Sequence, residues 1–260
     1  MDTQQQVPVV TYEPLRIIQA RKVGLSEPFE WLRLGWQTFT SLKGPALVFG
    51  ITFAAIGALI SYGAMSNPQM IFAFWSGFLL VAPVLAMATY HMAQSYEDGR
   101  TVSLGSCGRL MRRNIGSTLL LTLFLAVVMV AWIRISTLTT AVYTGGMTVQ
   151  IDLSTSLFDM ANLGLFATLG VVTFVFSLLM FALLAWSMPM LARGKQHFAT
   201  AIASSFAVVA KQPAPMLVWA GLIAGLTLLS MASYFIAFAV VFPWLAFATW
   251  EAYKSLFETE

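Results

Sequence analysis

The sequence predicts an all-α integral membrane protein with about six transmembrane helices. We expect three helical hairpins of like orientation, each preceded by an interfacial amphipathic helix. Three observations predict this fold. Hydrophobic residues make up 58% of the chain and charged residues only 10%, whereas a soluble domain carries roughly 25% charged residues. Long apolar runs recur along the chain, and the basic residues lie in alternate connections between these runs.

Five apolar runs are long enough to cross a hydrocarbon core, which takes about 20 residues. They cover residues 44–64, 70–95, 115–143, 163–191 and 214–253. The last run would be about 60 Å long as one helix, or about twice the thickness of the hydrocarbon core. We therefore divide it near residues 230–233 and expect six spans, with five spans as the alternative.

The basic residues predict the orientation of these spans. Of the 14 Lys and Arg residues, all except Arg134 lie before the first predicted span or after an even-numbered one. Positive connections stay cytoplasmic, so we expect both termini inside the cell. The predicted organisation is a cytoplasmic tail at 1–27 without signal-peptide features, a membrane domain at 28–253 and a cytoplasmic end at 254–260.

The tripeptide pattern Pro-x-Leu-Ala occurs three times, at Pro83, Pro189 and Pro243, near the end of an apolar run each time. At an offset of 160 residues the helices around the first and third copies match best, and Tyr90 aligns with Trp250. We interpret the chain as a tandem triplication, with repeats at about 28–98, 99–195 and 196–253. Such repeats are related by an axis along the membrane normal. Chance matching between apolar segments is the alternative.

Each of these prolines is expected to kink its helix, because proline lacks the backbone donor and clashes with the carbonyl four residues earlier. The favoured interpretation is a bend that lets the helix leave the bundle and follow the interface. The alternative is a freed carbonyl that lines a polar cavity.

Two segments outside the spans are amphipathic. Residues 28–43 place apolar and aromatic side chains at helical spacing, with charged side chains opposite, and residues 104–114 carry three arginines. Both are typical of helices that lie flat in the interface. We expect contacts with lipid headgroups from five residues, namely Arg33, Lys43, Arg109, Arg112 and Arg113. The alternative is that these charges only set the topology.

Arg134 is the one basic residue inside a predicted span. A charge near the membrane centre costs at least about 2.5 kcal/mol, so Arg134 needs a partner or an exit to the interface. Asp152 and Asp159 in the following external loop are the expected partners. A structural ion pair and a site for an anionic ligand both remain open, and so does the role of the loop at 144–160.

The sequence contains no recognisable catalytic set. It has one cysteine and two histidines, which excludes an internal disulfide and a cysteine-cluster metal site. His91 and His197 are expected to be interfacial residues, with haem ligation as the alternative. We predict no cofactor, no metal and no nucleic-acid partner. The Gly221-x-x-x-Gly225 motif favours packing within the chain, and a homo-oligomer is the alternative.

Three stretches carry a family resemblance: "WLRLGWQTF", "SGFLLVAPVLAMATYHM" and "PAPMLVWAGLIAGLTLL" followed by "PWLAFATWEAY". They resemble a bacterial family of integral membrane proteins catalogued as domain of unknown function 2189, over residues 29–257. The resemblance implies about six helices, a Gram-negative inner membrane and no catalytic residues. Some members carry a label as subunit I of cytochrome c oxidase, but two histidines are too few for that subunit's haem and copper ligands.

These observations favour a non-enzymatic accessory, scaffold or assembly subunit of a bacterial inner-membrane complex, with a respiratory complex as one candidate partner. The alternative is a transporter, channel or lipid-handling protein with a cavity between the hairpins. An enzymatic activity has the least support, because the spans carry almost no acidic residues and the chain shows no catalytic motif.

Overall fold

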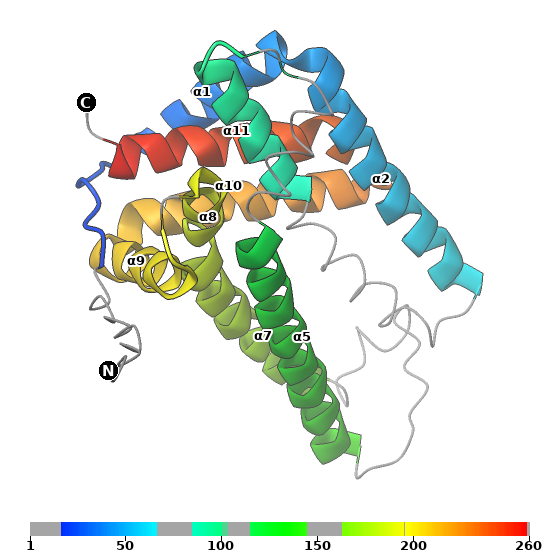
Figure 1. Cartoon of the computed structure of the whole chain (residues 1–260). Helices are drawn as coiled ribbons and strands as arrows, with labels where there is room; N and C mark the ends of the chain where they lie inside the picture. The colour runs from blue at the N-terminus through cyan, green and yellow to red at the C-terminus, as the bar shows by residue number, and fades with distance from the viewer. Residues whose placement is uncertain are drawn as a thin grey trace, which may run out of the picture.

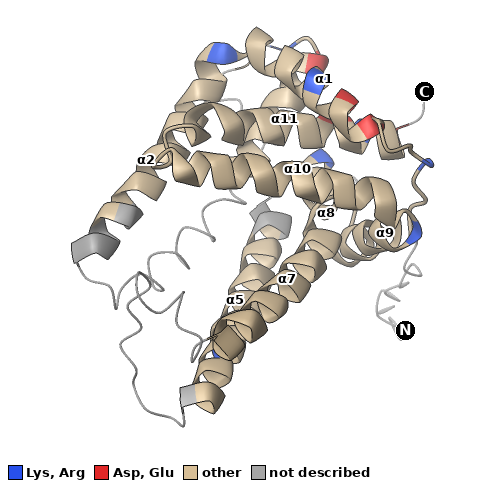
Figure 2. Cartoon of the chain, turned by 180° about the vertical axis from the view of Figure 1, so that it is seen from behind, with Lys and Arg blue, Asp and Glu red and all other residues tan. Residues whose placement is uncertain are grey.

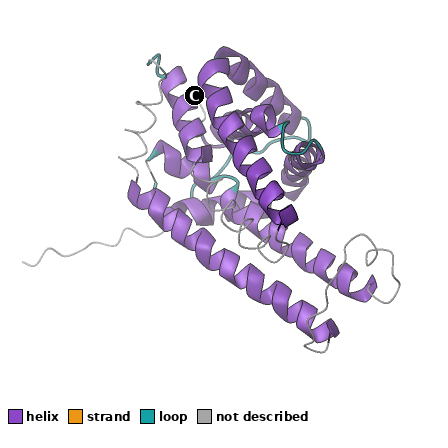
Figure 3. Ribbon diagram, turned by 90° about the vertical axis from the view of Figure 1, so that its right-hand side faces the viewer, coloured by secondary structure: helices purple, strands orange, loops and turns teal. Residues whose placement is uncertain are grey.

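The computed structural model of the chain describes residues 17–66, 85–100, 102, 115–144, 163–194 and 196–258 (Figure 1). Within these ranges every regular element is a helix (Figure 3). The labelled helices are α1 (Glu27–Ser41), α2 (Lys43–Ser66), α5 (Ile115–Thr144), α7 (Leu163–Leu184), α8 (Ser187–Arg193), α9 (Phe198–Lys211), α10 (Pro213–Ala232) and α11 (Phe238–Phe257). Residues 85–97 are also helical. The predicted all-α fold is confirmed for this part of the chain.

Three described helices are long and apolar enough to cross a membrane, over Leu119–Tyr143, Leu163–Arg193 and Pro213–Ala232. A fourth span results if α1 and α2, which meet at an angle of 106°, are counted together. The predicted number of six is not confirmed. Residues 70–84 of the second predicted span lie outside the described ranges. Helix α11, which carries Glu251 and Lys254, is not among the three candidate spans.

The helices form a body from which three long helices extend. In Figure 1, α1, α10 and α11 lie across one end of the molecule, and α2, α5 and α7 point away from it. Helices α5 and α7 lie side by side. They run obliquely to α10 and α11 in this view, and parallel helices would look parallel from any side. Three hairpins of like orientation are therefore not confirmed by the described helices.

The long apolar run at 214–253 is divided close to the predicted position. Helix α10 ends at Ala232, and the chain turns before α11 begins at Phe238. Tyr234 and Phe235 adopt left-handed backbone conformations, with φ of 53° and 69°. Such a conformation costs roughly 1–2 kcal/mol for each residue with a side chain. Burial of the Phe235 ring beside Phe53 and Phe238 offsets this cost.

Helix α11 is the centre of the body and is buried along most of its length. It packs most extensively against α1 and α2, and glycines make this approach possible. A Cβ atom added at Gly35 of α1 would lie 2.6 Å from the Cβ of Ala248. One added at Gly50 of α2 would lie 2.7 Å from the carbonyl carbon of Ala239. Real Cβ atoms do not tolerate such distances, so both positions require glycine.

Tryptophans from distant parts of the chain meet beside α11. The Trp31 ring packs edge-on against Trp186 and Trp219, with centroid distances of 5.8 Å and 5.6 Å. All three rings are buried. Elsewhere, Tyr90 and Trp250, which align at the offset of 160 residues, stack with their centroids 6.0 Å apart. The aligned ends of the first and third proposed repeats are therefore neighbours in space.

The prolines of the repeated pattern occupy different settings. Pro243 lies inside α11. Pro189 lies in the short helix α8, which begins after the chain leaves α7 at residues 185–186. Pro83 lies outside the described residues. The predicted kinks and their two interpretations stay predictions.

Residues 17–24 of the predicted N-terminal tail form an extended strap across the ends of three helices. The Ile18 amide donates to the Ser204 hydroxyl of α9 at 2.9 Å, and the Arg21 amide donates to the Leu256 carbonyl of α11 at 2.9 Å. The Gln212 side chain, at the start of α10, accepts from the Val23 amide and donates to the Arg21 carbonyl. The strap thus ties the N-terminal region to the C-terminal helices.

Candidate functional site

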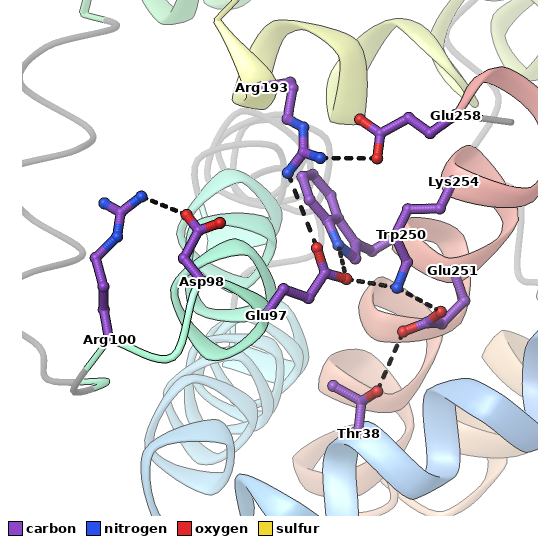
Figure 4. A network of polar contacts seen from close by, with 9 residues as sticks. All are labelled: Thr38, Glu97, Asp98, Arg100, Arg193, Trp250, Glu251, Lys254 and Glu258. Carbon is purple, nitrogen blue, oxygen red and sulfur yellow. Dashed lines mark hydrogen bonds and ion pairs between the residues drawn. The ribbon is translucent and has the colours of Figure 1, made fainter. Parts of the chain in front are cut away.

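A network of charged and polar side chains joins four parts of the chain at one end of the body (Figure 4). We call it the polar network, and it consists of Thr38, Glu97, Arg193, Trp250, Glu251, Lys254 and Glu258. These residues come from α1, the end of the helical segment 85–97, the end of α8, and α11 with the residue that follows it. Segments far apart in the sequence are therefore linked here by charge.

Glu97 is the centre of the polar network. Its Oε1 lies 2.5 Å from the Lys254 ammonium and accepts a hydrogen bond of 2.9 Å from the Trp250 indole N–H. Its Oε2 lies 3.8 Å from Arg193 Nη1. One carboxylate thus draws α8 and α11 toward the segment 85–97.

Arg193 forms the second junction. Its Nη2 donates to Glu258 Oε2 at 2.7 Å, and its guanidinium carbon lies 5.4 Å from the centroid of the Trp250 ring. The Arg193 side chain is only 18% exposed. A planar guanidinium can bind a carboxylate and stack on an aromatic face at the same time, which an ammonium group does less well.

Lys254 connects the polar network to α1 through Glu251. Its ammonium lies 2.8 Å from Glu251 Oε2, and the Thr38 hydroxyl donates to Glu251 Oε1 at 3.3 Å. Burial lowers the pKa of Lys254, but hydrogen bonds to Glu251 and Glu97 outweigh this effect and raise the pKa above its ordinary value. Lys254 is therefore a cation at any physiological pH.

The arrangement is suited to holding helix ends together. Each charged side chain of the polar network has an opposite charge beside it, so binding another ion would require breaking existing pairs. Within the described ranges, no group of three His, Cys, Asp or Glu side chains could hold a metal ion. The polar network therefore has the features of a structural clamp.

A second feature lies where α1 meets α11: Leu32, Arg33 and Trp36 of α1 and Trp244 of α11 line a groove of about 370 Å³. We call it the interfacial groove. Arg33 pairs there with Glu30, and this hydrogen bond lowers the pKa of the Glu30 carboxyl group. The groove is thus lined by two indoles and a cation that is already balanced by its neighbour.

The residues predicted from the sequence are distributed over several regions. Arg33 and Lys43 are exposed on α1 and at the start of α2, as headgroup contacts would require. Arg134 is exposed on α5. The expected partners of Arg134, Asp152 and Asp159, lie outside the described ranges, so the ion pair is not tested. The predicted headgroup contacts of Arg109, Arg112 and Arg113 also lie outside these ranges and are not tested.

The two histidines and the glycine motif lie in different environments. His91 is buried in the helical segment 85–97, and His197 is exposed at the start of α9. Gly221 and Gly225 are exposed, and no atom lies within 4 Å of a Cβ added at either position. The close helix contacts of the described structure involve Gly35 and Gly50 instead.

Sequence reasoning did not identify the residues of the polar network. A usable signal was present, because a charged residue follows each copy of Pro-x-Leu-Ala within about four turns of helix: Glu97, Arg193 and Lys254. Each one alone looks like an ordinary charge at a membrane boundary. Only their meeting at one point gives them a common role.

Comparison with known proteins places the chain among membrane proteins. Residues 71–193 match the family model described as "Predicted integral membrane protein (DUF2189)". The resemblance drawn from the sequence is confirmed over this segment, and the chain is an integral membrane protein with apolar helices. No curated protein and no solved structure gives a significant match to the chain.

Proposed function

We propose that this integral membrane protein is a non-enzymatic accessory or scaffold subunit of a bacterial inner-membrane complex, with a respiratory complex as one candidate partner. The main support is the exposure of the helix pair α5 and α7. In an apolar stretch of 18 residues within each of these spans only 6% of the residues are buried. The pair extends from the body (Figure 1), so most of its surface is available to other membrane helices.

The exposed surface of this pair is mostly apolar, with Arg134 as an exposed cation on α5. On α5 it includes Leu119, Leu123, Val127 and Val130, and on α7 it includes Val171, Phe174 and Val175. Lipid tails are as apolar as these side chains, so exposure alone does not drive association. Partner helices would add close packing that the pair lacks. The polar network, in this proposal, keeps the base of the pair rigid.

A proximity experiment tests the scaffold proposal. A photo-crosslinking residue is placed at Val127 of α5 or Val175 of α7, and a control residue at Leu228 on the exposed side of α10. The full chain is then irradiated in native membranes. We expect the same stoichiometric protein partner from both test positions and lipid adducts from the control. Native mass spectrometry of a clean monomer, without a copurifying protein, would contradict the proposal.

A transporter or channel for anions is the second candidate, because α5 carries an exposed cation inside an apolar span. Arg134 lies within the span Leu119–Tyr143, where an unpaired charge is costly. The chain reconstituted in liposomes would be assayed for chloride and phosphate flux. Loss of flux in Arg134→Ala, with normal folding, would support this function. Unchanged flux in that variant removes Arg134 from any such role.

We also propose an orientation with both termini in the cytoplasm. The support is the distribution of charge: apart from Arg134 on α5, the charged residues of the described structure gather around α1, α9 and the C-terminal end (Figure 2). Basic segments stay on the cytoplasmic side. In a Cys107→Ser background, a cysteine at Lys43 should resist a membrane-impermeant maleimide in intact cells and react in inverted vesicles. Labelling from outside would reverse the orientation.

A further inference from the structure

The interfacial groove, lined by Leu32, Arg33, Trp36 and Trp244, has walls that are almost entirely apolar. It is shallow and widely open, so it can hold only part of a larger molecule. Arg33 supplies the cationic group at its wall. The combination of an apolar wall and one guanidinium requires a ligand with an apolar portion directly next to an anion.

The two indoles that form the groove are held in place before any ligand arrives. The Trp244 indole N–H donates to the Leu32 carbonyl at 2.8 Å. The Trp36 ring packs edge-on against Trp244, with centroids 5.2 Å apart, and lies 5.3 Å from the Phe39 ring on its other side. A rigid wall needs little ordering on binding, which favours affinity.

The position of α1 places the groove at the membrane surface. Helices α1 and α2 meet at 106°, and α2 is an apolar helix of 24 residues. When α2 enters the bilayer, α1 lies nearly flat along the interface. Rotation of α1 about its own axis is fixed by the contact of Gly35 with Ala248. The groove, which lies where α1 meets α11, is therefore at the depth of the headgroup region.

Arg33 keeps donors available at this surface. Its Nε donates to Glu30 Oε2 at 2.9 Å, and its Nη2 also binds the Glu30 carboxylate. This exposed pair between neighbouring turns holds the guanidinium in position but contributes little energy. Among the described residues, no carboxylate is paired with Nη1 of Arg33. The Nη1 group can therefore donate to a phosphate, for which the planar guanidinium is well suited.

We propose that the interfacial groove is a binding site for a glycerophospholipid. The lipid phosphate accepts hydrogen bonds from Arg33, and the glycerol and first acyl methylenes lie against Trp36 and Trp244. The acyl chains continue into the bilayer through the open side. This site does not depend on whether the chain is a scaffold or a transporter.

The experiment measures phospholipid binding to the purified full chain in detergent. Native mass spectrometry counts retained phosphatidylglycerol, with diacylglycerol as a probe that lacks the phosphate. The test variant is Arg33→Gln. The matched control is Lys211→Gln, which removes another exposed cation at the end of α9, away from the groove lining. Equal thermal midpoints for the two variants establish that both fold.

The expected result is a loss of about tenfold in phosphatidylglycerol affinity for Arg33→Gln, the factor that one charged hydrogen bond supplies, and no loss for Lys211→Gln. Trp36→Ser should also weaken binding, although Arg33 remains. Equal losses in Arg33→Gln and Lys211→Gln, or no loss in either, overturn the proposal. Equal binding of diacylglycerol overturns it as well. If inorganic phosphate displaces the lipid completely, the groove is a site for free phosphate and the lipid assignment is wrong.

Discussion

Gly50 of α2 lies against the carbonyl group of Ala239 in α11, four residues before Pro243. This is the carbonyl that loses its usual helical donor, because proline has no N–H. The backbone of α2 packs directly on the altered turn of α11. Two features that look unrelated in the sequence, a small residue in the first span and a proline in the last helix, are thus parts of one contact.

Gly50→Ala should destabilise the chain by about 1–3 kcal/mol, because the added methyl group would overlap the Ala239 carbonyl and push the two helices apart. Gly221→Ala is the control, since nothing lies within 4 Å of a Cβ at that position. That substitution should be neutral or stabilising by up to about 1 kcal/mol through helix propensity. Denaturant unfolding in detergent measures both. Equal stabilities for the two variants would show that the close approach is not needed.

The hydrogen bond from Trp250 to Glu97 should contribute measurably to stability. Trp250→Phe keeps an aromatic ring beside Arg193 and Tyr90 but removes the donor, leaving the half-buried carboxylate with one partner fewer. We expect a loss of about 1–3 kcal/mol beyond the cost of the smaller ring. Trp219→Phe controls for ring size, because both indoles are fully buried and the Trp219 N–H has no hydrogen-bond partner in the described structure. A similar loss in both variants would refute a role for the hydrogen bond.

The contribution of Lys254 should depend on pH in one direction. Its folded-state pKa is raised, so its stabilising effect is complete below the unfolded value of about 10.4 and is lost as pH rises through the folded value. The difference in melting temperature between the native chain and Lys254→Met should therefore be constant between pH 6 and 9. It should shrink above about pH 10.5. A difference that already falls between pH 7 and 9 would contradict the raised pKa.

The strap at residues 17–24 should be released by loss of the Gln212 side chain. That amide accepts from the Val23 N–H at 2.8 Å and donates to the Arg21 carbonyl at 2.9 Å. Gln212→Ala should therefore increase the rate of tryptic cleavage after Arg21 or Lys22 several-fold, because local opening governs proteolysis. Gln37→Ala, at an exposed position of α1, is the control. If both variants are cleaved at the native rate, the strap is not held by Gln212.

Several elements could be predicted because their signals are local. The amphipathic pattern at 28–43 becomes α1, and the apolar runs at 115–143 and 163–191 become α5, α7 and α8. The division of the run at 214–253 followed from the thickness of a membrane, and α10 ends at Ala232. The periodicity of apolar residues and the length of an apolar run depend only on neighbouring residues, so both can be read directly from the sequence.

The polar network could not be predicted because its members are separated by up to 220 residues of sequence. Glu97 and Lys254 look like solvated charges until the ends of their helices meet. The glycine motif of α10 was misleading because close helix contacts also depend on segments far apart in the sequence. Gly221-x-x-x-Gly225 has the spacing that favours helix contact, yet its face is exposed, and Gly35 and Gly50 make the close contacts instead.

The amino-acid sequence alone determined that this is a helical membrane protein. A chain with so few charged residues cannot cover a water-exposed surface, and its apolar runs have the length of helices that cross a bilayer. The sequence also determined where most described helices begin and end, since these boundaries depend on adjacent residues. Only the tertiary structure decided which helix became the buried centre, which charges paired and which glycines met a neighbour. Those outcomes depend on distances between segments remote in the chain, and no local pattern specifies them.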